Sequence, residues 1–367
     1  MNRLDLIHVK RVSVLIFLIG LGFHGLRAQN QNLKFELLPG VDDISFGKIN
    51  SIIQDSRGYM WFSDQANHMI VRYDGSTVTK FLFDPEDPKS ISGYYPETLA
   101  RGKNGVVWFG YCQGGGLDHF YPKTDSFTNY LHDPEDSESL TNNNVSTILV
   151  DREGMVWAGT FDGLDRLDPS TGKFTHFLHD EKDTTSLSHQ IVRSIYEDSE
   201  GTLWVGTGEP WSSNPEEGGL NRYDPTTKSF TRYLHDPEDA NSLLGNAVRA
   251  IFEDSQGKLW VGTDKNGLHL IDRTAGTIKR VKFWPDASNN LQFPPSDKMM
   301  DHITFINEDH QGYLLIGVYD RGIVRWDPDR KNAVRYGADG IPAGDYDENT
   351  SWAACVSDQG MIWLASQ

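Results

Sequence analysis

The stretch "LVDREGMVWAGTFDGLDRLDPSTGKF", residues 149–174, decides the fold, because close copies of it recur along the chain. "YEDSEGTLWVGT" at 196–207 and "FEDSQGKLWVGT" at 252–263 repeat its Asp-x-x-Gly-x-x-Trp core. The glycine of this core recurs at intervals of 47 to 56 residues, at Gly58, Gly105, Gly154, Gly201, Gly257, Gly312 and Gly360. A period of this length is typical of solenoids, propellers and tandem arrays.

A large apolar residue follows each of these glycines three positions later. It is leucine in the sixth copy, Leu315, and tryptophan in the others: Trp61, Trp108, Trp157, Trp204, Trp260 and Trp363. Aspartate precedes the glycine by three positions in five copies, whereas the second has Gly102 and the seventh has Ser357. We interpret the tryptophans as core residues that fill the space between neighbouring sheets, and the aspartates and glycines as turn residues.

Each repeat is predicted to form four short strands, as the third repeat illustrates. Residues 147–150 are apolar and β-branched, 155–159 carry the tryptophan, and 164–167 and 173–178 alternate between apolar and polar positions. The pattern predicts an all-β fold, a seven-bladed β-propeller of four-stranded antiparallel blades. We expect the last blade to be incomplete or closed by an N-terminal strand, because the seventh copy contains only two strands. The predicted blade cores lie near 49–82, 96–130, 145–178, 191–234, 247–282, 302–336, and 352–367 plus 33–38.

The N-terminal segment has the pattern of a secretory signal peptide. Arg3, Lys10 and Arg11 form a positive region, a mostly apolar run covers 12–26, and Ala28 precedes a polar residue. We predict a signal peptide at 1–28, with cleavage after Ala28, and a propeller at 29–367. An uncleaved anchor helix is the alternative, although the run is shorter than a membrane span requires. The predicted location is therefore periplasmic or secreted.

Charge and cysteine content exclude several classes of function. The formal net charge is −18, with a sequence pI near 5.0, which argues against a nucleic-acid partner. The two cysteines, Cys112 and Cys355, are interpreted as free thiols. Acidic segments such as "HDPEDSESLTNNN" at 132–144 do not have the spacing of a calcium loop, and no metal or cofactor is predicted.

The segments "SIYEDSEGTLWVGT" (194–207) and "GGLNRYDP" (218–225) resemble the two-component regulator propeller repeat. The resemblance covers about residues 45–367. It implies the periplasmic sensor region of hybrid two-component histidine kinases, found largely in Bacteroidetes-type bacteria, many of which respond to glycans. It also implies an oligosaccharide ligand, a homodimer, and a histidine kinase module in full-length relatives.

The sequence departs from that family in one respect. We find no glycine-rich ATP lid and no phosphoacceptor helix, so no kinase activity is expected of this chain. We interpret the chain as a fragment of a longer sensor or as a short stand-alone relative.

The candidate binding site lies on the face formed by the links between blades and between the second and third strands. The longest of these loops, 207–219, brings together Trp211, Asn214 and Glu216. An aromatic ring beside amide and carboxylate groups suits a sugar ring or a protein partner. The other candidate ligand-binding residues on this face are Tyr95, Tyr111, Asp162, Asn266 and Tyr319.

Two other functions remain open, a propeller enzyme of the lyase or lactonase type and a cell-surface interaction scaffold. Streptogramin-lyase-like propellers have similar repeats. A propeller enzyme needs non-repeating polar residues that converge at the central channel. Histidines outside the repeated positions scatter over different strands and show no triad spacing: His68, His119, His189, His269, His302 and His310. No catalytic residue is therefore predicted, and sensing is favoured.

Overall fold

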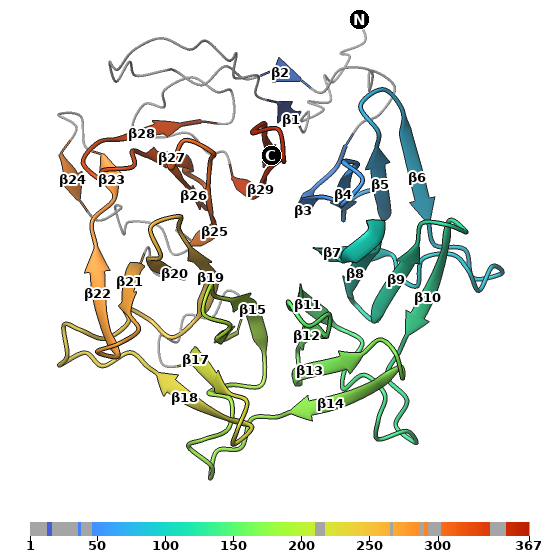
Figure 1. Ribbon diagram of the computed structural model, residues 1–367, viewed down its shortest axis with the longest axis horizontal. Helices are drawn as coiled ribbons and strands as arrows, with labels where there is room; N and C mark the ends of the chain where they lie inside the picture. The colour runs from blue at the N-terminus through green and yellow to red at the C-terminus, as the bar shows by residue number, and fades with distance from the viewer. Residues whose placement is uncertain are drawn as a thin grey trace, which may run out of the picture.

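The computed structural model has its strands arranged as sheets around a central axis (Figure 1). It describes residues 13–16, 36–37, 46–209, 217–264, 267–285, 290–292, 302–337 and 350–366. The predicted all-β architecture of four-stranded antiparallel blades is confirmed. Within these ranges the only helical element is the short η1 (Lys103–Gly105), and no helix has the length and apolar character of a membrane span.

Six blades are each built from four consecutive strands, which pair in sequence order. The first two contain β3 (Ile49–Gln54), β4 (Met60–Asp64), β5 (Met69–Tyr73) and β6 (Val78–Leu82), then β7 (Tyr95–Arg101), β8 (Val107–Cys112), β9 (Leu117–Tyr121) and β10 (Ser126–Tyr130). The next two contain β11 (Val145–Val150), β12 (Val156–Thr160), β13 (Gly163–Asp168) and β14 (Lys173–Phe177), then β15 (Val192–Glu197), β16 (Leu203–Thr207), β17 (Gly219–Asp224) and β18 (Ser229–Tyr233). The last two contain β19 (Val248–Glu253), β20 (Leu259–Thr263), β21 (Leu268–Asp272) and β22 (Thr277–Val281), then β25 (Ile303–Glu308), β26 (Leu314–Val318), β27 (Gly322–Trp326) and β28 (Ala333–Tyr336).

The predicted count of seven blades is not met, because only six have four consecutive strands. The seventh copy contributes β29 (Ser351–Val356) and β30 (Ile362–Ser366), whose sheet has the order β2-β1-β30-β29. Here β1 (Ser13–Ile16) pairs with β30, and β2 (Glu36–Leu37) pairs with β1. We expected residues 33–38 to pair with the last blade directly; instead, a segment of the predicted signal peptide lies between them. Its β-branched residues suit a strand, and β30 would otherwise present an unpaired edge.

The seventh pair of strands also joins the ring to the first blade. The Asp358 backbone N–H donates to Gln54 Oε1 at 2.6 Å, and Gln54 Nε2 donates to Gln359 Oε1 at 3.2 Å. Trp363 packs with Phe62 and Tyr73 of the first blade in one buried cluster. The innermost strands β3, β7, β11, β15, β19, β25 and β29 therefore surround the axis (Figure 1). An additional two-stranded ribbon joins β23 (Trp284–Pro285) to β24 (Leu291–Gln292).

The motif tryptophans pack between blades, as predicted. All six, and Leu315 in the sixth copy, are at most 4% exposed. Trp61 of the first blade contacts Phe109 and Phe120 of the second, with ring centroids 5.6 and 5.0 Å apart. Such aromatic burial contributes on the order of 2–3 kcal/mol for each side chain. The wedge between sheets is therefore a principal source of the stability of the ring.

The motif aspartates do more than the turn chemistry predicted for them. Asp198 Oδ1 accepts the backbone N–H groups of Glu200 and Thr202 at 3.1 and 2.8 Å, as a turn residue would. Its Oδ2 also accepts the indole N–H of Trp204 at 2.9 Å. The same indole–carboxylate bond joins Trp61 to Asp55, Trp157 to Asp151 and Trp260 to Asp254.

The two C-terminal copies show what happens when one partner changes. Leu315 has no N–H to donate, and the guanidinium of Arg325 takes its place at Asp309 Oδ2, at 2.9 Å. Ser357 replaces the aspartate in the seventh copy, and the Nε1 of Trp363 has no partner among the described residues. The indole–carboxylate bond therefore links the turn of each repeat to the residue that packs between blades.

Replacing Asp198 by alanine tests this bond. The substitution leaves the buried indole N–H of Trp204 and the Arg273 guanidinium without their shared carboxylate. We expect the free energy of unfolding to fall by about 2–4 kcal/mol at pH 7, measured by urea denaturation. Asp224→Ala, at an exposed turn, is the matched control and is expected to change stability much less. Equal losses in the two variants would contradict the assigned role.

The pH dependence gives a second readout of the same substitution. Burial acts to raise the pKa of Asp198, but the bonds from Trp204, Thr202 and Arg273 outweigh it and hold the pKa below its usual 3.8. The ionised form therefore stabilises the fold above pH 4, and this contribution is lost as the pH falls through the folded-state pKa. The gap in stability between the parent and Asp198→Ala should narrow on acidification below pH 4.

Candidate functional site: the central channel pocket

Each innermost strand contains a β-bulge near its start. The pairing with the second strand skips one residue, and these skipped residues form what we call the bulge ring: Asn50, Glu97, Ser146, Arg193, Arg249, Thr304 and Trp352. A bulge bends the strand and redirects the side chain of the unpaired residue. All seven of these side chains line one pocket of about 310 Å³.

A glycine opposite the bulge explains how the inner strands approach the axis closely. In the third copy this is Gly159, where a Cβ would lie 2.6 Å from Val192 Cγ1 of the next blade. Gly206 has the same relation to Val248, and Gly262 to Ile303. The glycine two positions after the motif tryptophan therefore leaves room for the neighbouring inner strand to pack against it.

The rest of the pocket wall comes from both sides of the bulge ring. Lys48 precedes β3, and Ser51 and Thr98 directly follow bulge residues. The remaining lining residues stand where the second strand of a blade ends: Gln65, Cys112 and Phe161. The pocket thus lies at the end of the channel that carries the links between blades, which is the face the sequence predicts for binding.

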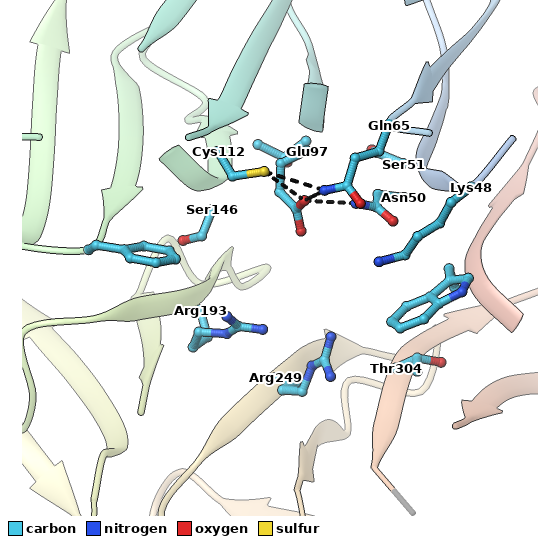
Figure 2. Close-up of a pocket in the computed structure, with 13 residues that line it drawn as sticks. Lys48, Asn50, Ser51, Gln65, Glu97, Cys112, Ser146, Arg193, Arg249 and Thr304 are labelled. Atoms are coloured by element: carbon cyan, nitrogen blue, oxygen red, sulfur yellow. Dashed lines mark hydrogen bonds between the residues drawn. The ribbon is translucent and has the colours of Figure 1, made fainter. Parts of the chain in front are cut away.

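One side of the pocket is a hydrogen-bonded group around a carboxylate. Glu97 Oε2 accepts from Asn50 Nδ2 at 2.7 Å and from Gln65 Nε2 at 2.8 Å, and Cys112 Sγ lies 3.6 Å away (Figure 2). Burial, with a smaller effect of the Glu97 charge, raises the pKa of Cys112 to about 11. Asn50 Oδ1 is buried and accepts no hydrogen bond from the described residues. This side therefore holds an acceptor without a donor beside a fixed negative charge.

The opposite side of the pocket is cationic. Arg193 and Arg249, from neighbouring blades, extend into the pocket across from Glu97 (Figure 2). Burial and the Arg249 charge lower the pKa of Arg193 to about 10. Lys48 Nζ lies 4.0 Å from the centre of the Trp352 ring, and burial lowers its pKa as well. Three cationic groups and one carboxylate thus line the pocket of a chain whose net charge is −18.

Half of the predicted ligand-binding residues fall where the structure gives no information. Trp211, Asn214, Glu216 and Asn266 lie outside the described residues. Their proposed part in binding stays a prediction.

The other four predicted residues have different positions. Tyr95 and Tyr319 flank the pocket: the Tyr95 carbonyl accepts from Cys112 Sγ at 3.5 Å, and the Tyr319 ring packs edge-on against Trp352 at 5.3 Å. Asp162 is exposed at the rim, where it accepts from Asn142 Nδ2 at 2.6 Å. Tyr111 is a correction, because it is fully buried and donates its hydroxyl to Asp118 Oδ2 at 2.7 Å. It contributes to the core and cannot contact a ligand.

The histidines considered for catalysis do not line the pocket. His269 is fully buried, and its Nε2 accepts the backbone N–H of Leu244 at 2.9 Å. Asp118 and Asn221 hold the corresponding loops in other blades through the N–H groups of Ser92 and Ser188. This third-strand position therefore anchors the link between blades.

Two further histidines have packing roles. His119 stacks on Trp108, with ring centroids 4.3 Å apart. His302 is buried next to Asp264, with its Nδ1 3.4 Å from Oδ1. Within the described ranges, no group of three or more His, Cys, Asp or Glu side chains could hold a metal ion.

The bulge ring was missed by sequence reasoning, although the sequence contains a signal for it. Each ring residue stands eight positions before a motif glycine, as Asn50 does before Gly58. The flanking positions keep β-branched or small residues in most copies, whereas this position changes among amide, carboxylate, hydroxyl, guanidinium and indole. A variable position inside a repeated frame marks a site that is free of packing constraints.

Comparison with known proteins agrees with this architecture. Residues 139–162, 186–209 and 242–265 match the model of the two component regulator propeller family. The chain carries the two component regulator propeller repeat, and the resemblance found in the sequence is confirmed. No curated protein sequence matches the chain.

Three solved structures share the fold. The extracellular domain of a hybrid two component system from B. thetaiotaomicron has a TM-score of 0.66 and 23% identity, over 88% of this chain and 40% of that one. PorZ, a surface component of the type-IX secretion system of Porphyromonas gingivalis, has a TM-score of 0.64 and 16% identity, over 91% and 48%. A virginiamycin B lyase from Staphylococcus aureus has a TM-score of 0.58 and 14% identity, over 87% and 95%. The chain thus spans less than half of the first two proteins.

The thiol of Cys112 provides a direct probe of the pocket. In a Cys355→Ser background, we expect iodoacetamide to alkylate Cys112 at pH 8 at least ~10-fold more slowly than it alkylates glutathione, because little thiolate forms when the pKa is near 11. Glu97→Gln should accelerate the reaction modestly, since the Glu97 charge contributes less to the pKa shift than burial does. Mass spectrometry follows the adduct, and a rate equal to that of glutathione would contradict the described environment.

Proposed function

We propose that this chain is the ligand-sensing propeller of a two-component signal transduction system, and that it binds an oligosaccharide in the channel pocket. The observation that carries the proposal is the bulge ring, which places seven side chains of different chemistry in one pocket of a repeated frame. The ring includes an indole, a carboxylate, an amide and two guanidinium groups. An aromatic face bordered by a few polar groups is the usual composition of a carbohydrate site.

We further propose that the propeller acts outside the cytoplasm. The predicted signal peptide with cleavage after Ala28 supports export, as does the fold shared with an extracellular sensor domain. A membrane helix and a histidine kinase module would belong to the full-length relative, and a homodimer would transmit the signal.

A lyase is the second candidate, because the virginiamycin B lyase shares the fold over 95% of its length. That structure was determined as a catalytically inactive variant in which a histidine is replaced by alanine. Here the pocket lining contains no histidine. The likeness to PorZ similarly favours a surface scaffold as a third candidate. Sensing accounts better for a pocket whose described lining has several hydrogen-bonding groups and no histidine beside a carboxylate for proton transfer.

A thermal-shift screen against a panel of acidic and neutral oligosaccharides tests the proposal. We expect at least one member to raise the melting temperature by several degrees, as tight binding to the native state requires. Trp352→Ala should abolish that shift, because it removes the aromatic face of the pocket. Tyr121→Ala, at an exposed position outside the pocket lining, is the control and should retain the shift.

The same samples discriminate the alternatives. If the protein converts a streptogramin B antibiotic, as detected by mass spectrometry, the sensing proposal is wrong and the lyase function is favoured. A shift that survives Trp352→Ala would move the site away from the channel.

A further inference from the structure

Among the described residues, the lining of the channel pocket carries more cationic side chains than carboxylates. Lys48, Arg193 and Arg249 face one carboxylate, Glu97, which already accepts from two amide groups. Asp264 lies 4.0 Å from Arg249 and is also close to His302. Adjacent like charges in a half-buried site are unfavourable unless a counter-charge is supplied.

Arg193 stands out among the poorly exposed arginines of this chain. Arg273, Arg325 and Arg330 each have a carboxylate oxygen within 3.1 Å of the guanidinium. Arg232 instead donates to backbone carbonyls of the neighbouring loop. The Arg193 guanidinium makes no hydrogen bond or ion pair with the residues that the structure describes; burial lowers its pKa, and the more distant charges of Asp264 and Glu97 act in the opposite direction. Its five N–H donors remain available to a molecule inside the pocket.

We propose that Arg193, together with Arg249, binds the carboxylate of an acidic oligosaccharide, so that the ligands of the pocket are uronate-containing glycans. The inference rests on the proposed function and names its ligand class. A planar guanidinium matches a carboxylate in a bidentate arrangement, and such charge-assisted bonds are about twice as strong as neutral ones. A neutral sugar would leave Arg193 buried and unpaired.

The remaining pocket groups determine how such a ligand lies. Trp352, half-buried in the pocket wall, contributes apolar surface beside Lys48 against which a pyranose ring can pack. On the side opposite the two arginines, Glu97 Oε1 accepts no bond from the described residues, so it can accept a sugar hydroxyl proton. The pocket therefore has a donor side for the acid and an acceptor side for hydroxyls. A carboxylate placed next to Glu97 would be repelled, which fixes the orientation.

Calorimetric titration compares oligosaccharides that differ only in the acid. The acidic probes are tetrasaccharides of galacturonate and of hyaluronan, and the matched neutral probes are the same chains with the carboxylates reduced to alcohols. We expect at least one acidic probe to bind about tenfold or more tightly than its reduced form. Raising sodium chloride from 50 to 300 mM should weaken only the acidic probe.

Substitutions locate the effect. Arg193→Gln should weaken the acidic probe about tenfold or more and leave the neutral probe unchanged, whereas Arg193→Lys should recover part of the loss. Arg222→Gln, at an exposed strand position, removes the same charge and should have no effect. The melting temperature of the ligand-free Arg193→Gln variant should be unchanged or raised, since no internal partner is lost. If Arg193 had a purely structural role, the melting temperature of the ligand-free Arg193→Gln variant would fall.

The outcomes separate this inference from the proposed function. Equal binding of acidic and reduced probes, or binding of neutral sugars alone, overturns the acid recognition and leaves a sugar-binding sensor. Unaltered binding of the acidic probe by Arg193→Gln likewise overturns it. If inorganic sulfate or acetate binds and no oligosaccharide does, the pocket is an anion site and the assignment of a glycan ligand is wrong. Absence of binding by every probe overturns both proposals.

Discussion

The hydrogen bond between the motif aspartate and the indole N–H of the motif tryptophan underlies the structure. One carboxylate closes the turn between the first two strands through its first oxygen and orients the wedge between blades through its second. Local turn geometry and the packing of neighbouring sheets are thereby set by the same side chain. A buried indole N–H is normally satisfied within the protein, and in four copies the motif carboxylate satisfies it. The contact of Arg325 with Asp309, where leucine replaces tryptophan, shows that the carboxylate itself still needs a buried donor.

The candidate binding pocket depends on a different feature of the same strands. The bulge takes one residue out of the pairing pattern, so its side chain faces the axis and has little part in the core. Packing fixes the residues on either side of it, because they contact the neighbouring blade. The ring position has no such constraint, which explains why Ser146, Arg193 and Trp352 occupy equivalent places. The residues that pack between blades and the residues that line the pocket are therefore neighbours in each strand, and a change in one set need not disturb the other.

This division also explains what the sequence predicts and what it does not. The repeat period, the turn residues and the buried tryptophans are local or periodic signals, and they predict the blade architecture correctly. The pairing of β1 with β30 depends on residues far apart in sequence, and no local pattern indicates it. The count of complete blades was wrong for the same reason. Tyr111 was assigned to the binding face because it ends a strand there, whereas its hydroxyl turns inward to Asp118. To find the bulge ring from the sequence, one must compare the same position in all seven copies. A search for the spacing of catalytic residues does not make this comparison.

The bulge ring has a consequence for how such proteins diversify. Duplication of a repeat copies its four strands together with one bulge residue that does not pack between blades. A substitution of that residue changes the pocket without disturbing the packing of the propeller. Seven such positions, which in this chain hold six different residue types, allow many combinations of pocket chemistry. The chemistry of the pocket can then change by stepwise substitution inside an unchanged framework.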